Sequence, residues 1–233
     1  MNVVVPMAGE GLRLKEGYKM PKPFININGE PMFNWALKSI DKDNNFIFIV
    51  RKDHSMAVKI IKDYYPNAEI IIQEGKLDGA VKTIELAEKY IDNDMPLMIV
   101  DCDISVNINM YDFITNALMS YDGAIVTFTS TDTKYSYAKT QGKKVYEVAE
   151  KKAISNDAIA GVFFWSKGSD YVKYSKALIE KDIRVNDEFY VSTVFNEAIK
   201  DNKEITFANA DSFFHLGTTK ELEDFIEENR ERS

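Results

Sequence analysis

Short apolar runs alternate with longer amphipathic segments through the first half of the chain, and this alternation limits the fold more than any other feature. Five runs are expected to be strands: residues 2–6, 46–50, 69–73, 96–100 and 123–129. Four amphipathic segments are expected to be helices: residues 32–40, 55–65, 80–90 and 110–121. Alternation of this kind forms right-handed βαβ units, so we predict an α/β fold with a mixed, mostly parallel sheet flanked by helices. Runs 69–73 and 96–100 are almost continuously apolar, which indicates strands covered on both faces.

The pattern changes after about Thr131. Residues 135–152 are typical of a hairpin with its turn near Gly142, and residues 158–165 of a strand. Four more elements complete the chain: helices at 168–182 and 188–201, a strand at 204–210 and a helix at 220–231. Mixed strands after a parallel half suggest a second lobe built onto the same sheet. Because no repeat, linker or low-complexity segment is evident, we predict one domain over residues 1–233, with two halves that meet near residue 130.

Composition excludes several classes of protein. The chain has 233 residues, of which 45% are hydrophobic, which is enough for a sizeable core. A formal net charge of -8 argues against a general nucleic-acid binder. The single cysteine, Cys102, rules out an intrachain disulfide and favours a reducing compartment. No window offers the roughly twenty apolar residues of a membrane span. We therefore expect a soluble, cytoplasmic protein without nucleic-acid or membrane partners; a homo-oligomer stays open.

A long irregular segment, "PMAGEGLRLKEGYKMPKPF", follows the first strand. It contains two close glycines, Gly9 and Gly11, and the cations Arg13 and Lys22. Long loops in compact domains are usually functional or disordered. In open parallel sheets, ligands bind beyond the carboxyl ends of the strands, where this loop is expected. Glycines allow backbone N–H groups to approach a phosphate, and Arg and Lys add positive charge, so the segment predicts a phosphate site.

Two standard phosphate-binding motifs do not account for this loop. The P-loop pattern GxxxxGK[ST] is absent, and the dinucleotide pattern GxGxxG matches at Gly9 and Gly11 but has Leu14 in place of the third glycine. The two glycines alone would be compatible with an ordinary turn. Arg13 or Lys22 alone would be compatible with a solvated surface charge. Their combination directly after the first strand is what favours a phosphate site.

Two carboxylates follow the apolar run 96–100. Asp101 and Asp103 stand at positions i and i+2, and in an extended segment such side chains point the same way. Carboxylate oxygens suit Mg²⁺, which retains several waters and bridges substrate phosphates. The sequence therefore predicts a magnesium site held by Asp103 and Asp101. Alternatively, Asp101 caps a turn and Asp103 alone is functional.

Several segments resemble the nucleotidyltransferases that make nucleotide sugars. "AGEGLRL" followed by "PKPF" is similar to that family's opening signature, glycine-x-glycine-x-arginine and then Pro-Lys-Pro-hydrophobic. "NGEPMFNWAL" resembles its next segment, and weaker agreement continues in order through "YAKT", "EVAEKK", "AGVFFW" and "LGTTKEL". The resemblance covers nearly the whole chain. It implies a Rossmann-like sheet of the glycosyltransferase-A, or nucleotide-diphospho-sugar transferase, type. The implied reaction joins an NTP to a phosphorylated acceptor, by default a sugar 1-phosphate, and releases pyrophosphate.

The resemblance also implies roles for single residues in the first half. Arg13 and Lys22 are expected to hold the triphosphate and to stabilise the departing pyrophosphate. Asp103 matches the family's usual metal-binding aspartate, and Asp101 is an additional one. Six positions are expected at the nucleotide: Ala8, Gly9, Glu10, Gly11, Gln73 and Gly79. Of these, Gln73 is equally compatible with a polar residue at a strand end.

The second half, residues 131–233, is expected to bind the acceptor, as residues 1–130 are expected to bind the nucleotide. Five positions are implied: Tyr137, Glu150, Lys151, Gly161 and Glu188. "VAEKK" resembles the family's Glu-Lys-Pro element, which makes Glu150 a candidate for an acceptor hydroxyl and Lys151 for its phosphate. Lys152 replaces the proline of that element. Glu188 could instead cap its helix.

One departure concerns the metal. Many relatives have an aspartate that is a second metal ligand near the end of the chain, and this chain has His215 there, in "FFHLGT". Mg²⁺ prefers oxygen to nitrogen ligands. We therefore expect His215 to be a packed or hydrogen-bonding residue, and metal binding to depend on the earlier aspartates.

Three other functions remain open from the sequence. "DCD" is also the D-x-D pattern of glycosyltransferases that use a ready-made sugar nucleotide, although these do not need an Arg and a Lys around a triphosphate. A CTP-dependent cytidylyltransferase for phosphocholine or another phosphorylated alcohol is the second possibility. For it, aromatic residues would hold a quaternary ammonium by cation–π attraction, unless they simply form core: Tyr135, Tyr137, Phe163, Phe164, Trp165 and Tyr190. The third is a non-catalytic nucleotide sensor.

Overall fold

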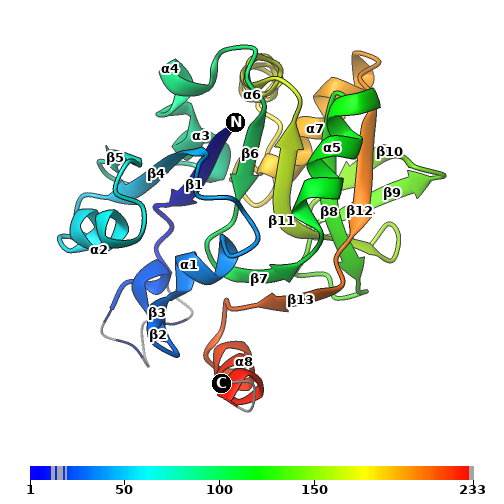
Figure 1. Ribbon diagram of the computed structural model, residues 1–233. Helices are drawn as coiled ribbons and strands as arrows, with labels where there is room; N and C mark the ends of the chain where they lie inside the picture. Colours follow the sequence, from blue (N-terminus) through cyan, green and yellow to red (C-terminus); the bar gives the residue numbers. More distant parts are fainter. Residues whose placement is uncertain (12–13, 15–17, 19, 231–233) are drawn as a thin grey trace.

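The computed structural model describes residues 1–11, 14, 18 and 20–230 (Figure 1). Within these residues, nine strands form one sheet. Its spatial order is β5 (Glu69–Gln73), β4 (Asn45–Arg51), β1 (Asn2–Met7), β6 (Leu97–Val100), β11 (Asp157–Trp165), β8 (Gly123–Thr129), β12 (Ile205–Asn209), β10 (Lys144–Ala149) and β9 (Tyr137–Gln141). Both halves of the chain therefore contribute to a single sheet.

The strands of the first half are parallel, as predicted. β5, β4, β1 and β6 run in the same direction, so their carboxyl ends meet at one edge of the sheet. β11 is antiparallel to both β6 and β8, while β12 runs parallel to β8. β9 and β10 form the predicted hairpin, and Gly142 in its turn has a φ of +60°. The sheet is therefore mixed, and β5, β4, β1 and β6, all from the first half of the chain, form a parallel part.

Helices cover both faces of the sheet (Figure 1). Their bounds are α1 (Met32–Ala36), α2 (Ala57–Tyr64), α3 (Ala80–Glu85), α4 (Glu88–Ile91), α5 (Met110–Ser120), α6 (Gly168–Glu180), α7 (Val191–Lys200) and α8 (Thr219–Arg230). Val3 and Val5 of β1 pack with α1, α2 and α5 in one core, whereas Val4 packs with α3, α4, α6 and α7 in another. This alternation is expected because successive side chains of a strand point to opposite faces.

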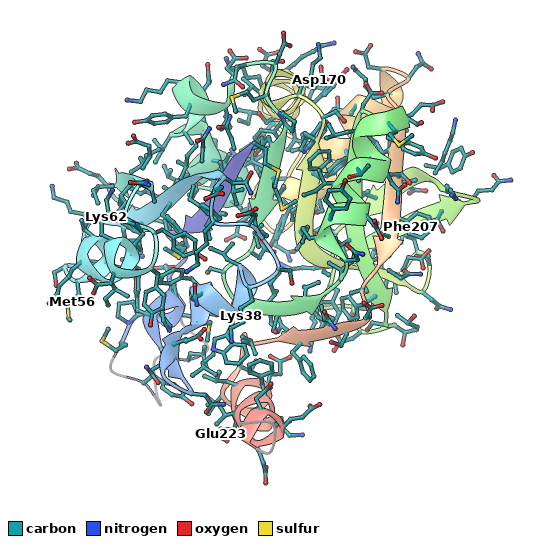
Figure 2. The ribbon with its side chains drawn as sticks, viewed as in Figure 1. Lys38, Met56, Lys62, Asp170, Phe207 and Glu223 are labelled. Carbon is teal, nitrogen blue, oxygen red and sulfur yellow. The ribbon has the colours of Figure 1, made fainter. Side chains whose placement is uncertain are left out.

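Three local predictions are wrong. β5 is not covered on both faces: it is the outermost strand, and Ile72 is 46% exposed. The helix before it, α2, is exposed on one side, where Lys62 and the preceding residue Met56 lie at the surface (Figure 2). The helix predicted at 80–90 is broken into α3 and α4. The helix predicted at 32–40 ends at Ala36 and continues as turns with i to i−3 bonds, such as Leu37 N–H to Asn34 O at 3.2 Å.

Four short strands were not predicted. β7 (Ile104–Asn107) pairs antiparallel with β13 (Ser212–His215), and β2 (Asn26–Ile27) pairs with β3 (Glu30–Pro31). The β7–β13 pair connects the segment after β6 to the end of the chain, and α8 then packs on a third, smaller core (Figure 1). In the part of the chain that the structure describes, no helix has the length and apolar character to cross a membrane.

Candidate active site

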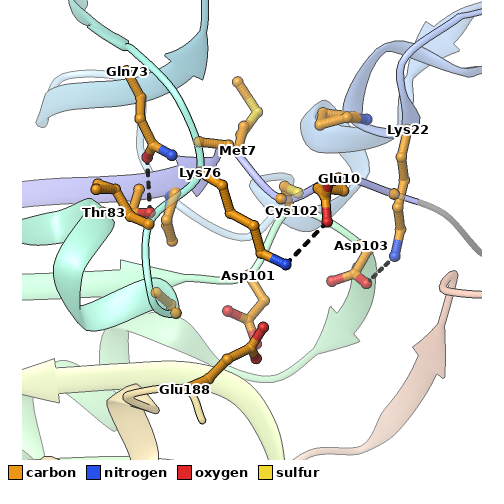
Figure 3. A pocket seen from close by; sticks show the side chains of 18 residues that line it. Met7, Glu10, Lys22, Gln73, Lys76, Thr83, Asp101, Cys102, Asp103 and Glu188 are labelled. Carbon is orange, nitrogen blue, oxygen red and sulfur yellow. Dashed lines mark hydrogen bonds and ion pairs between the residues drawn. The ribbon is translucent and has the colours of Figure 1, made fainter.

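Two adjoining cavities lie beyond the carboxyl ends of the parallel strands. The first, of about 480 Å³, is lined by the loop after β1, the loop after β5 and the segment after β6 (Figure 3). The second, of about 540 Å³, is lined by parts of β7, β11 and β13, the segment around Glu150 and the chain that leads into α7. Both cavities are lined by Ala80, Asp101, Asp103 and Glu188. The aspartates therefore stand where a ligand in one cavity would meet a ligand in the other.

The first cavity gathers the predicted nucleotide residues. Its lining includes Ala8, Gly9, Glu10, Gly11, Lys22, Gln73, Gly79, Asp101 and Asp103. Arg13 lies outside the described residues. A Cβ atom on Gly9 would meet nothing within 4 Å, so the backbone there is open to a ligand. Lys76 and Thr83 also line this cavity and were missed by the sequence reasoning, because neither belongs to a recognisable motif.

Gln73 and Gly79 shape one wall of the first cavity. Gln73 is buried, accepts a hydrogen bond from Thr83 Oγ1 (2.9 Å) and donates one to Gly75 O (3.1 Å). Its amide is therefore held by protein. Gly79 has a φ of +96°, and a Cβ atom there would lie 2.5 Å from the carbonyl oxygen of Phe189. Glycine is required at 79 because that backbone passes so closely.

Asp103 is paired with two basic side chains. Lys22 Nζ donates a hydrogen bond to Asp103 Oδ2 (Figure 3), and His215 Nε2 lies 3.5 Å from the same oxygen. Burial opposes ionisation of Asp103, but Lys22 and His215 outweigh it and hold the pKa of this carboxyl well below its ordinary value. Asp103 is therefore an anion at neutral pH.

His215 is held in place from its other side. β13 pairs His215 with Ile104, and Leu216 N–H donates to Asp103 O at 2.7 Å, so the histidine stands beside the aspartate. Its Nδ1 lies 2.9 Å from Glu221 Oε2. Burial alone would lower the pKa of His215, but Asp103 and Glu221 raise it. His215 is thus a hydrogen-bonded residue that lines the second cavity.

Glu221, at the start of α8, accepts hydrogen bonds from several donors. It accepts hydrogen bonds from Thr218 N (3.0 Å) and Oγ1 (2.8 Å), and Lys134 Nζ lies 2.7 Å from its Oε1. Burial would raise the pKa of Glu221, but Lys134, Thr218 and His215 lower it to about 2. Glu221 therefore orients both Lys134 and His215, two basic groups of the second cavity.

Asp101 lies against Gly161 of β11. Burial, together with the Asp103 and Glu150 carboxylates, raises the pKa of Asp101 to about 7. Asp101 and Asp103 are thus in different states: one is readily protonated and the other is held ionised. Gly161, one of the expected acceptor positions, lines the second cavity.

Glu150, Lys151 and Glu188 also line the second cavity. Glu150 accepts hydrogen bonds from Ser136 Oγ and from Ser192 Oγ, the latter at 2.8 Å. Burial raises the pKa of Glu150 although the two serines counteract it. Lys151, which precedes the replaced proline position, has a φ of +54°, a conformation uncommon for residues other than glycine.

The structure does not bring Tyr137 to either cavity. Its side chain is fully buried, and its hydroxyl donates to Asp132 O at 2.8 Å. Among the other aromatics considered, Phe164 and Trp165 lie in the core and line neither cavity. Tyr135, Phe163 and Tyr190 line the second cavity, and Phe163 is also a core residue. Phe213 joins them there and was missed, because β13 was not predicted.

The donor set suits Mg²⁺. Among the described residues, no group of three or more His, Cys, Asp or Glu side chains could by itself hold a metal ion. Mg²⁺ does not need one, since it is usually bound by one or two carboxylates together with waters and substrate phosphates. Asp101 and Asp103 offer those carboxylates at the wall shared by the two cavities.

A mixed α/β sheet thus carries two adjoining cavities at one edge, with Asp101 and Asp103 in their shared wall. The sequence model described as Nucleotidyl transferase matches residues 3–232, and the chain belongs to this family.

The relatives fit this assignment. The curated bifunctional protein GlmU of Methanococcus aeolicus is 24% identical over 211 residues, 87% of this chain and 48% of that protein. The chain thus spans about half the length of that curated relative.

Solved structures share the fold. A nucleoside-diphosphate-sugar pyrophosphorylase from Vibrio cholerae RC9 superimposes with a TM-score of 0.83 at 22% identity, over 97% of this chain and 99% of that one. An inositol-1-phosphate CTP transferase from T. maritima has a TM-score of 0.73 at 16% identity, over 97% and 93% of the two chains.

Proposed function

We propose that this protein transfers a nucleotidyl group from an NTP to a phosphorylated acceptor, by preference a sugar 1-phosphate, and releases pyrophosphate. One observation carries the proposal: the two cavities share Asp101 and Asp103, with Lys22 on the side of the first cavity and Lys151 in the second. A site for a single ligand would not need a second chamber with its own carboxylate and ammonium groups. The name of the V. cholerae relative, a nucleoside-diphosphate-sugar pyrophosphorylase, supports a sugar phosphate as the acceptor.

In this proposal the NTP occupies the first cavity, with its base towards Gln73 and Gly79 and its phosphates towards the loop after β1. An oxygen of the acceptor phosphate attacks the α-phosphorus in line, and the bond from that phosphorus to the pyrophosphate oxygen breaks. Pyrophosphate leaves as an anion. Lys22 and Arg13 stabilise that anion, as such reactions depend mainly on positioning and charge neutralisation.

Asp103 and Asp101 would hold Mg²⁺ together with phosphate oxygens. When bound, the ion supplies charge neutralisation and polarises a phosphoryl oxygen. The chain's own contribution is to keep the two carboxylates ready: Lys22 keeps Asp103 ionised, and the close contact with Gly161 fixes the position of Asp101. In the second cavity, the Glu150 carboxylate accepts a hydrogen bond from a hydroxyl group of the second substrate, and Lys151 binds that substrate's phosphate.

A phosphorylated amino alcohol is the second candidate, because aromatic rings line the second cavity and one structural relative is named as a CTP transferase for an alcohol phosphate. Two of those rings already have a lysine ammonium over them: Lys134 lies 4.8 Å from the centre of Tyr135, and Lys151 lies 4.6 Å from that of Tyr190. A quaternary ammonium would have to displace a lysine. This observation favours an anionic or neutral acceptor over phosphocholine.

A pyrophosphate-release screen tests the proposal. ATP, CTP, GTP, UTP and dTTP are each combined with glucose 1-phosphate, N-acetylglucosamine 1-phosphate, inositol 1-phosphate and phosphocholine in the presence of Mg²⁺. Turnover with a sugar 1-phosphate is expected. Turnover with CTP and phosphocholine alone would favour the second candidate, and nucleotide binding without turnover on any acceptor would contradict both.

Two variants check the assigned roles in the same assay. Asp103→Asn removes a charge that Lys22 and His215 neutralise, and Arg13→Ala removes a predicted phosphate contact. Both are expected to abolish pyrophosphate release while the circular dichroism spectrum stays that of the wild type. Normal turnover by either variant would show that its residue has been assigned the wrong role.

A further inference from the structure

An ion pair crosses the first cavity. Lys76 Nζ, from the loop after β5, lies 3.3 Å from Glu10 Oε2, from the loop after β1 (Figure 3). Both residues line the cavity, and Figure 3 shows the lysine extending into it from the opposite wall. No motif in the sequence draws attention to Lys76. Glu10 was expected at the nucleotide, yet its carboxylate repels the phosphates that the glycine loop is proposed to bind.

The described part of this cavity carries more acidic than basic side chains. Among the described lining residues, the acids are Glu10, Asp101, Asp103 and Glu188, and the bases are Lys22 and Lys76. Lys22 is bound to Asp103. Among the described lining residues, Lys76 is therefore the base that is not already bound to an aspartate.

The contact between Lys76 and Glu10 is one that a ligand can replace. Their side chains are 67% and 38% exposed, and exposed ion pairs are weak because water competes for both partners. A phosphate oxygen offers a stronger, charge-assisted hydrogen bond in a less solvated place.

The backbone that carries Lys76 is held while its side chain can move. Gln73 Nε2 donates to Gly75 O at 3.1 Å, and Gly79 N donates to Leu77 O at 2.9 Å, so both flanks of the loop are tied. Exchange between partners then requires only rotation about side-chain bonds.

We propose that Lys76 leaves Glu10 and binds the β- or γ-phosphate of the nucleotide when the first cavity is filled. This inference rests on the proposed function of that cavity as the NTP site. Glu10 then has the opposite role: it holds Lys76 over the cavity when no nucleotide is present, and it competes with the phosphates for the ammonium.

Isothermal titration calorimetry of nucleotide binding, in the presence of Mg²⁺, tests this inference. The probe is whichever of ATP, CTP, GTP, UTP and dTTP the wild type binds most tightly, together with the matching nucleoside monophosphate. Lys76→Met is expected to weaken NTP binding about tenfold or more, the size of one charge-assisted hydrogen bond, and monophosphate binding by less than about twofold. Lys76→Arg should retain most of the affinity.

Lys52→Met is the matched control. Lys52 forms a similar ion pair with Glu74 at 2.7 Å, its side chain is 69% exposed, and it lines neither cavity. This variant should bind the NTP as the wild type does. Equal Kd values for Lys76→Met and Lys52→Met would overturn the inference, and so would an equal loss for the NTP and the monophosphate.

Glu10→Gln completes the set. It is expected to bind the NTP at least as tightly as the wild type, because the competing acceptor is gone. A loss as large as that of Lys76→Met would contradict the exchange. A wild type that binds none of the five NTPs would overturn the proposed function itself, which the variants alone cannot do.

Discussion

Asp101 and Gly161 lie in direct contact. Asp101 N–H donates to Gly161 O at 2.9 Å, and a Cβ atom on residue 161 would lie 2.6 Å from Asp101 Oδ2. Gly161 also has a φ of +74°, a conformation that side chains disfavour. The position of the Asp101 carboxylate therefore depends on the absence of a side chain on the neighbouring strand.

Gly161→Ala is expected to damage activity more than stability. The left-handed backbone alone should cost about 1–2 kcal/mol of unfolding free energy, and the added methyl group should push Asp101 away from the wall shared by the two cavities. Pyrophosphate release should fall at least about tenfold, since small displacements of reacting groups are costly.

Gly142→Ala separates the two effects. Gly142 has a φ of +60°, and a Cβ atom there would meet nothing within 4 Å. This variant should lose a similar amount of stability in urea unfolding and keep its activity. Equal activity of Gly161→Ala and Gly142→Ala would show that the contact with Asp101 does not matter for turnover.

Lys22→Met tests the partner of Asp103. The lysine is largely buried, with 12% of its side chain exposed, and it is proposed to bind both Asp103 and the leaving group. We expect kcat for pyrophosphate release to fall about a hundredfold or more, in the range reported for single electrostatic groups in active sites. Lys38→Met, which removes a surface ion pair with Glu30 near α1 (Figure 2), should have normal kcat. A kcat for Lys22→Met within twofold of the control would exclude Lys22 from the chemistry.

Glu150→Gln should have two separate effects, one on the pH dependence of stability and one on acceptor binding. Burial raises the pKa of Glu150, so the folded state holds its proton more tightly than the unfolded state does. Stability must then fall as the pH rises from the unfolded pKa through the folded one. The introduced glutamine does not ionise, so the variant does not lose stability in this way. Its free energy of unfolding should therefore rise relative to that of the wild type between pH 4 and pH 8.

The same variant should raise KM for the acceptor, because an amide replaces the carboxylate that is proposed to accept a hydrogen bond from the acceptor's hydroxyl group. KM for the NTP should stay unchanged. Urea unfolding at several pH values and initial-rate kinetics measure the two effects separately. A pH-independent stability difference would mean that Glu150 ionises as easily in the folded as in the unfolded chain.

Glu221→Gln should weaken the protein near neutral pH and lose its effect in acid. The pKa of Glu221 is lowered to about 2 from an unfolded value of 4.5, so its ionised form stabilises the fold above about pH 5, and this contribution disappears as the pH falls towards 2. Because the side chain is 23% exposed, we expect a loss of about 1–2 kcal/mol at pH 7. Urea unfolding at pH 7, 4 and 3 measures this.

Glu223→Gln is the control for that series. Glu223 lies on the exposed side of α8 (Figure 2). It should change the unfolding free energy by less than about 0.5 kcal/mol at each pH, as expected for a surface substitution. A gap between Glu221→Gln and wild type that persists unchanged at pH 3 would contradict the assigned pKa.

The sequence predicts the parallel half of the sheet well because buried strands and amphipathic helices have distinct periodicities. It also predicts which segments reach the first cavity, since the carboxyl ends of parallel strands share one edge. Gln73 and Gly79 were placed there by resemblance, and they do line it. That Gln73 already bonds Thr83 and Gly75 could not be foreseen, because it depends on how the following loop folds back.

Tertiary pairing accounts for most of what the sequence does not predict. β7 and β13 are short and lack clear alternation, yet their pairing carries His215 to Asp103 from the other end of the chain. Tyr137 shows the opposite case: its residue type fits an acceptor contact, but its strand turns the ring into the core. The exposure of β5 likewise follows from its place at the sheet edge, which local sequence does not encode.

The wall that carries Gly79 is joined to the chain that leads into α7. Phe189 N–H donates to Asp78 O at 2.9 Å, Val81 N–H donates to Phe189 O at 3.2 Å, and Arg184 bonds Asp78 at 2.9 Å. The first segment lines the first cavity, and the second contributes Glu188, Tyr190 and Val191 to the second cavity. Anyone who exchanges loops on this scaffold will therefore have to transplant both segments together, because replacing either one alone breaks the hydrogen bonds that join them.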